Sequence, residues 1–263
     1  MDSDPPFHGR APHHERERPD ISVLATTVLS VLGDKGDQGC RQVRSSMVDA
    51  LIDATLAPGQ FDGKLVLDAL ARGRLGAEEI VDIYIPEAAR RMGAMWVADD
   101  LSFARVTIGS ARLQGLLALL AAPWSAGTSG TRSRIEALLV LQGDDAHTLG
   151  PHVAASQMRR LGVGVRILFN QDAKIVLRML QEDCFDLILF STSRTEALAP
   201  IAQMVKRMRA ELSRVPPVVL GGLVQDLAEK VQERTGVDLV TTDVRAALRL
   251  CEREKQKTRS LAG

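Results

Sequence analysis

A chain of 263 residues is long enough for two domains of ordinary size. Its formal net charge is +0, which argues against a protein that holds nucleic acid or a membrane surface by charge alone. The first twenty residues are polar, and the longest apolar run, Leu116 to Trp124, is too short to cross a bilayer. We therefore expect a cytoplasmic protein.

Residues 1–20 combine prolines and mixed charges with three of the five histidines, His8, His13 and His14. This composition cannot bury enough apolar surface to fold alone, so we expect a disordered tail. The three histidines could be incidental, or they could contribute to a metal or ligand site elsewhere in the chain.

Residues 21–122 carry apolar side chains at helical spacing. Glycine, proline and aspartate pairs separate the helices, and Pro86 predicts a kink within the fourth. Short connections between the helices predict an antiparallel helical bundle, followed by a linker over residues 123–133 that is rich in small residues. The predicted helices are 21–32, 43–56, 61–70, 77–96 and 101–121.

Residues 134–255 alternate between short apolar strands and helices, which predicts a doubly wound parallel sheet. The predicted strands are 135–141, 163–169, 187–190, 218–220 and 239–240. The predicted helices are 152–161, 173–183, 196–212, 223–235 and 244–253. The fold class is thus α/β plus all-α, an N-terminal helical bundle and a flavodoxin-like (Rossmann-like) five-stranded parallel sheet, with a disordered tail over 256–263.

Polar residues and glycines follow three of the predicted strands. Asp145 and His147 follow the first strand, Ser191 to Ser193 follow the third, and Gly221 and Gly222 follow the fourth. In the strand order 2-1-3-4-5 these strands are neighbours, and ligands bind at the carboxyl ends of such sheets. The sequence therefore predicts a continuous groove for an elongated ligand.

Other sites on this scaffold fit less well. A phosphorylation receiver domain needs an aspartate where Ser191 stands and a lysine where Thr241 and Thr242 stand. A flavin mononucleotide site needs several hydroxyls after the first strand, where only Thr148 is present. A zinc site from Asp145, His147 and His152 is conceivable, although Pro151 at the start of the helix turns His152 away.

The segment Asp145-Ala-His147-Thr-Leu-Gly150 resembles the Asp-x-His-x-x-Gly signature of cobalamin-binding domains. Ser191 to Ser193 resembles the family's Ser-x-Leu element, with Ser193 in place of leucine, and Gly221-Gly222 its Gly-Gly element. The resemblance implies that His147 is the lower axial ligand of cobalt and that Asp145 accepts a hydrogen bond from its other ring nitrogen. It implies that Ser191 bonds to Asp145 or to the cofactor tail.

The segments 85–96 and 101–113 resemble the helical cap that precedes such domains in methionine synthase and in the cobalamin photoreceptor regulators. The resemblance implies that Trp96 lies over the upper face of the corrin; the alternative is a plain core tryptophan. The photoreceptor regulators carry Glu-His where this chain has Val106 and Thr107. We therefore expect hydroxocobalamin or aquocobalamin, with the upper position left to water, hydroxide or a mobile group such as a tail histidine.

The loop around His147, the segment Gln157-Met-Arg-Arg-Leu-Gly162 and the polar tail look most like the PpaA/AerR antirepressors of photosynthesis genes. This resemblance implies a cobalamin-binding transcriptional regulator that is not an enzyme. It would act on a PpsR/CrtJ-type repressor and reach DNA only through that protein, and it could respond to light. The alternative is a corrinoid methyl-carrier subunit of a methyltransferase system. Direct DNA contact through the basic residues near Arg207 and Lys255 is a third, weaker hypothesis, because charged helix faces are usually only solvated.

Overall fold

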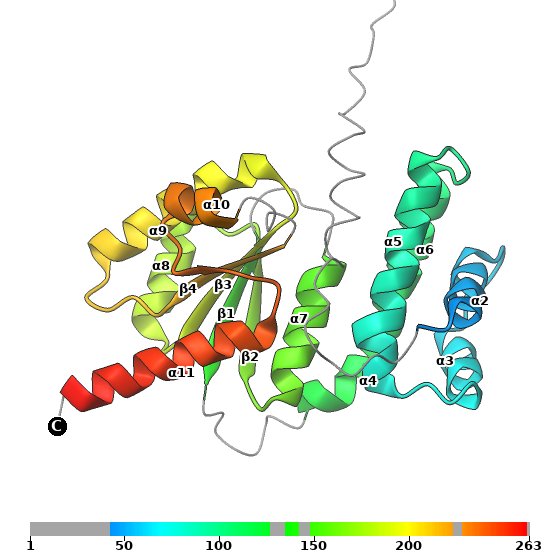
Figure 1. Ribbon diagram of the computed structural model, residues 1–263, viewed down its shortest axis with the longest axis horizontal. Coiled ribbons are helices and arrows are strands. Elements are labelled where there is room, and N and C mark those ends of the chain that lie inside the picture. The colour runs from blue at the N-terminus through cyan, green and yellow to red at the C-terminus, as the bar shows by residue number, and fades with distance from the viewer. Residues whose placement is uncertain (1–42, 127–134, 142–147, 223–227, 262–263) are drawn as a thin grey trace, which may run out of the picture.

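The computed structural model describes residues 43–126, 135–141, 148–222 and 228–261. Figure 1 shows a helical bundle beside an α/β domain, with helix α7 between the bundle and the sheet. The predicted tail with its histidines, the predicted helix 21–32, and Asp145 and His147 lie outside the described residues.

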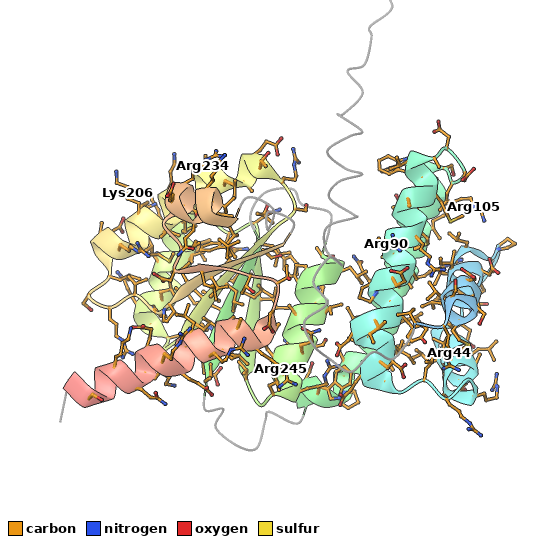
Figure 2. All side chains as sticks on the ribbon, in the orientation of Figure 1. Arg44, Arg90, Arg105, Lys206, Arg234 and Arg245 are labelled. Carbon is orange, nitrogen blue, oxygen red and sulfur yellow. The ribbon has the colours of Figure 1, made fainter. Side chains whose placement is uncertain are left out.

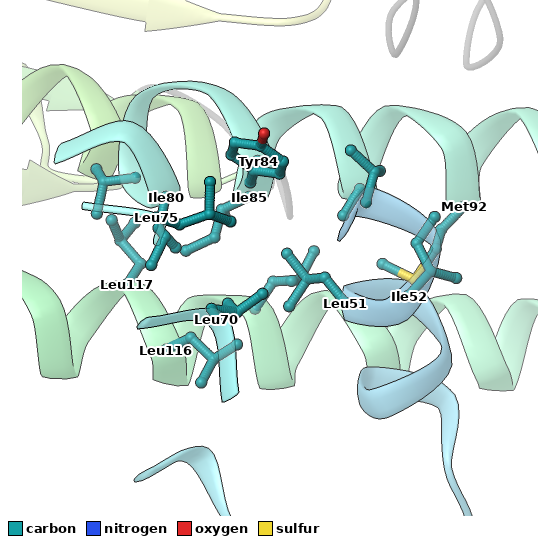
Figure 3. Packing of buried hydrophobic residues seen from close by; sticks show 14 of the residues in the cluster. Leu51, Ile52, Leu70, Leu75, Ile80, Tyr84, Ile85, Met92, Leu116 and Leu117 are labelled. Atoms are coloured by element: carbon teal, nitrogen blue, oxygen red, sulfur yellow. The ribbon is translucent and has the colours of Figure 1, made fainter. Parts of the chain in front are cut away.

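The bundle is built from α2, α3, α5 and α6, with two short helical turns before α5. Its bounds are α2 Ser45–Leu56, α3 Gly63–Arg72, α4 Ala77–Glu79, the π-helix η1 Ile80–Tyr84, α5 Ile85–Val97 and α6 Phe103–Ala126. Leu51, Tyr84, Ile85 and Met92 are fully buried members of one apolar cluster that runs along the bundle (Figure 3). The predicted helices 43–56, 61–70, 77–96 and 101–121 all have counterparts here.

Pro86 disturbs its helix in a defined way. The chain widens into the π-helix just before the proline, and the N–H of Ile85 donates to the carbonyl of Ile80, five residues back. Proline has no N–H and its ring crowds the preceding turn, and a wider turn accommodates both defects. The predicted kink is therefore a π-turn, and it places Asp82 on the side of the bundle that meets α7.

Helix α6 is longer than predicted. It continues through Pro123 to Ala126, so the prediction that a linker begins at residue 123 was wrong for its first four positions. Trp124 packs on the bundle core and lies 4.5 Å from the Arg160 guanidinium of α7, which holds the last turn in place.

The segment Phe103–Ser125 of α6 is long and apolar enough to cross a membrane by length and composition, with a mean hydropathy of 1.3. This length was not predicted, because the longest uninterrupted apolar run, Leu116 to Trp124, is much shorter. In the structure, α6 packs against α2, α3, α5 and α7.

The second domain has a five-stranded parallel sheet of order β2-β1-β3-β4-β5, which confirms the predicted fold class. The strands are β1 Glu136–Leu141, β2 Gly164–Phe169, β3 Leu187–Thr192, β4 Val218–Gly222 and β5 Leu239–Val240. The helices are α7 Leu149–Arg160, α8 Ala173–Glu182, η3 Thr195–Ala197, α9 Leu198–Glu211, α10 Ala228–Thr235 and α11 Val244–Leu261.

Alternate strand residues enter two separate cores, as the period of two along a strand requires. Leu138 and Val140 pack with α8 and α9 on one face. Ala137 and Leu139 pack with α7 and α11 on the other, and Figure 1 shows the helices on the two faces.

Helix α11 also exceeds its predicted length. It continues to Leu261, so the prediction of a disordered tail from residue 256 was wrong for the described residues. Ion pairs support this extension: Lys255 lies 2.9 Å from Asp186, and Lys257 lies 2.6 Å from Glu254.

Candidate functional site

The carboxyl edge of the sheet places the predicted groove residues side by side. Leu141 at the end of β1 pairs with Ser191 on β3, and Ser191 pairs with Gly221 on β4. Ser191 and Gly221 were predicted to lie just after their strands; instead, β3 and β4 each extend two residues further and include them. The ladder itself therefore fixes their spacing.

Gly222 is required by its own neighbours in the sheet. Its φ is +107°, and a Cβ at this position would lie 2.0 Å from the carbonyl oxygen of Thr192. A Cβ on Gly221 would meet only an ordinary contact at 3.4 Å from the Thr241 carbonyl. A close approach at the glycine pair was predicted for a ligand. At Gly222, the group that approaches closely is the backbone of β3.

Ser191 and its neighbours differ in how their polar groups are used. The Thr192 hydroxyl is buried, donates to the carbonyl of Arg194 and accepts from its N–H, both at 3.1 Å, which turns the chain out of β3. Ser193 is half-buried. The half-buried Ser191 hydroxyl makes no hydrogen bond to the described residues, so it is available to a ligand.

Open space lies beside Gly150, the second residue of α7. A Cβ built on Gly150 would meet no atom of the described residues within 4 Å. Helix α7 begins at Leu149, three residues earlier than predicted, which makes Pro151 its third residue. Asp145 and His147 belong to residues 142–147, between β1 and this helix start, outside the described part of the chain.

The bundle overhangs the carboxyl edge. Helix α6 runs in the same direction as α7: Gln114 donates to Thr148 at the start of α7, at 2.8 Å, and Ser125 lines a cavity with Arg159 at its end. Helix α7 runs back from the carboxyl edge, because it follows β1 and precedes the parallel β2. The part of α6 before Gln114 therefore extends beyond that edge.

The overhang presents an exposed and mostly apolar face. Trp96 at the end of α5 and Phe103 at the start of α6 have ring centroids 6.0 Å apart and planes 56° apart. Trp96 is half-buried and Phe103 is 68% exposed, so neither is a plain core residue. The exposed residues of this α6 stripe, which continues into the cavity wall at Gly115 and Ala118, are Phe103, Ala104, Thr107, Ile108 and Ala111.

A cavity of about 510 Å³ lies between α6 and α7. It is lined on α7 by His152, Ser156 and Arg159, so His152 faces α6 and packs beside Phe169, with centroids 5.9 Å apart. Within the described residues, no three His, Cys, Asp or Glu side chains are grouped to hold a metal. This cavity was not predicted: the small residues that line it on α6 are interspersed with leucines, and they face α7 only in the folded chain.

The basic residues singled out for DNA contact are mostly paired. Arg207 lies 2.9 Å from Glu211, and Arg209 lies 2.9 Å from Asp238. Figure 2 shows labelled cationic side chains spread over both domains, from Arg44 to Arg245. This distribution does not favour a single basic surface.

No protein-family model matches the chain. The uncharacterized 20.5 kDa protein of the bchF-crtJ intergenic region of Rhodobacter capsulatus is 34% identical over 180 residues, which cover 68% of this chain and 94% of that protein. The chain belongs to the family of that protein.

One solved structure shares the fold described above. The monomethylamine corrinoid protein of Methanosarcina barkeri superimposes with a TM-score of 0.62 at 15% identity, over 78% of this chain and 94% of that one. A cobalamin-binding protein of Desulfitobacterium hafniense gives a TM-score of 0.42 at 18% identity, over 79% of this chain and 96% of that one.

Proposed function

We propose that this protein is a cobalamin-binding transcriptional regulator of the antirepressor type. The observation that carries the cofactor proposal is the shape of the carboxyl edge. The free Ser191 hydroxyl and the open space at Gly150 lie beneath an overhang that exposes Phe103. A flat apolar group with a polar tail fits between such surfaces, and the Asp-x-His-x-x-Gly segment adjoins them.

The residues present are chemically suited to a corrinoid. His147 offers an imidazole, a good ligand for first-row transition metals, and Asp145 can fix its tautomer. Ser191, Ser193 and the glycine pair at 221 and 222 would hold the tail, and Trp96 would cover the opposite face. A bound corrinoid supplies a cobalt centre whose axial ligands and oxidation state can change.

A regulatory role is supported by the relative in Rhodobacter capsulatus. The gene of that relative lies between bchF and crtJ. A CrtJ-type repressor is the partner that the family resemblance implies. A ligand that contacts both domains favours their closed arrangement, because binding shifts the population toward the conformation that makes more contacts with the ligand. A closed cap would then alter the surface offered to the repressor, and DNA would be reached only through that protein.

Size-exclusion chromatography of the protein with a CrtJ-type repressor tests this role. We expect the hydroxocobalamin-loaded protein to form a complex that the H147A variant forms more weakly. The matched control is H152Q, which removes a histidine from the α6–α7 cavity and should behave like the wild type. Equal complex formation by wild type and H147A, with and without cofactor, would contradict the cofactor link.

The alternative function is a corrinoid methyl carrier. It is favoured by the shared fold with the monomethylamine corrinoid protein, which resembles this chain over both domains. Incubation with reductant and a methyl donor, followed by extraction of the corrinoid, separates the two functions. Methylated cofactor in stoichiometric amount favours the carrier; unchanged cofactor favours the regulator.

A further inference from the structure

We propose that the cavity between α6 and α7 is a second binding site, for an organic anion with an apolar chain. The site goes beyond the cobalamin proposal, because its walls are Gln114 to Ser125 on α6 and His152 to Arg159 on α7. A volume of about 510 Å³ lies within the range of small-molecule pockets.

One wall of the cavity is apolar and made of small side chains. Gly115, Ala118, Ala121 and Ala122 lie on one face of α6, and Leu117 borders them. Side chains this short cannot reach across to α7, which leaves the space between the helices unfilled. An unbranched apolar chain is the kind of group that such a wall can pack against.

The opposite wall carries a positive charge with no counter-ion in the part of the chain that the structure describes. The half-buried Arg159 guanidinium donates a hydrogen bond of 3.1 Å to the carbonyl of Val165. No carboxylate among the described residues pairs with this guanidinium. The next residue, Arg160, is also largely buried but lies 2.6 Å from the Asp82 carboxylate. Removing a charge from water without a partner is costly, so the Arg159 side of the cavity favours an anion.

The second titratable group in the cavity does not oppose an anion. Burial lowers the pKa of His152, and the nearby charge of Arg159 lowers it further, so the imidazole is neutral at pH 7. A neutral imidazole still has one N–H donor to offer. Gln114 also lines the wall, and its amide N–H₂ donates to the Thr148 hydroxyl at 2.8 Å.

A carboxylate with a medium alkyl chain matches both walls, with its head at Arg159 and its chain along α6. Because α6 belongs to the bundle and α7 to the α/β domain, such a ligand would contact both domains. It would therefore hold the bundle against the sheet.

Isothermal titration calorimetry of cofactor-free protein with octanoate tests the site, with NMR of the His152 ring as the local readout. We expect saturable binding to the wild type and a shift of the His152 signals. Octan-1-ol, which has the same chain and no charge, should bind at least about tenfold more weakly. R159M should lose affinity by at least about tenfold, whereas R178M, which removes an exposed arginine of α8, should bind like the wild type.

A118L keeps the charge and fills the cavity, so it should also abolish binding, and it serves if R159M does not fold. Equal octanoate affinity in wild type, R159M and A118L would overturn the proposal, as would octan-1-ol binding as tightly as octanoate or no saturable binding at all. H147A should retain the octanoate site, which separates this test from the fate of the cobalamin proposal.

Discussion

Arg160 on α7 donates to both carboxylate oxygens of Asp82 on the π-helix, each at 2.6 Å. Gln157 donates to the same carboxylate at 3.3 Å, and the guanidinium lies over the Trp124 ring. Asp82 on η1 and Trp124 on α6 thus both contact α7, so this cluster fastens the bundle to the α/β domain at the end opposite the proposed cofactor groove.

Replacing Arg160 should loosen this attachment. The two side chains are 11% and 29% exposed, so R160M should lower the free energy of unfolding by about 2 kcal/mol, less than the loss of a fully buried pair. Urea unfolding of the wild type and R160M measures this change in free energy. The control is R207M, which breaks an exposed pair with Glu211 and should leave the free energy of unfolding nearly unchanged. Equal losses in both variants would contradict the role assigned to Arg160.

Two glycines at the carboxyl edge should respond in opposite ways to alanine. G222A forces a Cβ against the Thr192 carbonyl at positive φ and should cost at least about 2 kcal/mol. G150A places a methyl group in open space within a helix and should leave stability unchanged or raise it by up to about 1 kcal/mol. If Gly150 borders the cofactor, the same G150A variant should retain less cobalamin despite its stability. Thermal unfolding and corrin retention after desalting check both statements.

The overhanging aromatic pair should matter for ligand binding more than for folding. Phe103 is 68% exposed, so F103A should cost less than about 1 kcal/mol of stability and still lower cobalamin retention. Leu113, fully buried on the same helix, is the comparison: L113A should cost about 3 kcal/mol. A fully stable F103A protein with undiminished retention would show that the overhang does not contact the cofactor.

His152 should make stability depend on pH. Its folded pKa lies below the ordinary value of 6.5 because of burial and then Arg159, so the unfolded chain binds more protons below pH 6.5. Stability should therefore be complete above pH 6.5 and fall as the pH drops toward the folded pKa, with a slope of at most about 1.4 kcal/mol per pH unit. In H152Q this part of the slope should vanish, and in R159M it should shrink. Urea unfolding at pH 7.5, 6.5 and 5.5 gives the comparison, and identical slopes in wild type and H152Q would count against it.

The strands could be predicted from sequence because each is a short apolar run between polar turns, and their order followed from the doubly wound arrangement that alternating strands and helices adopt. The element ends were harder, since they depend on distant contacts. Trp124 and Pro123 suggest a linker when considered alone, yet Arg160 from the next domain holds Trp124 in a helix. The charged end of α11 similarly gains ion pairs, one of them with Asp186, that local composition does not reveal.

Part of the groove could be predicted because it follows from the order of the strands. Ser191 and Gly221 occupy strand ends, so the parallel order alone makes them neighbours. The α6–α7 cavity could not be predicted, because it depends on how small residues of the bundle face Arg159 of the other domain. Likewise, the need for glycine at position 222 comes from the Thr192 backbone and not from a ligand.

The most direct test of the account is a visible absorption spectrum of purified protein mixed with hydroxocobalamin and desalted, beside H147A and H152Q. We predict corrin bands that are retained and shifted in the wild type and in H152Q, and lost or altered in H147A. A wild type that retains no corrin, or an H147A spectrum identical to that of the wild type, would contradict cobalamin binding through His147.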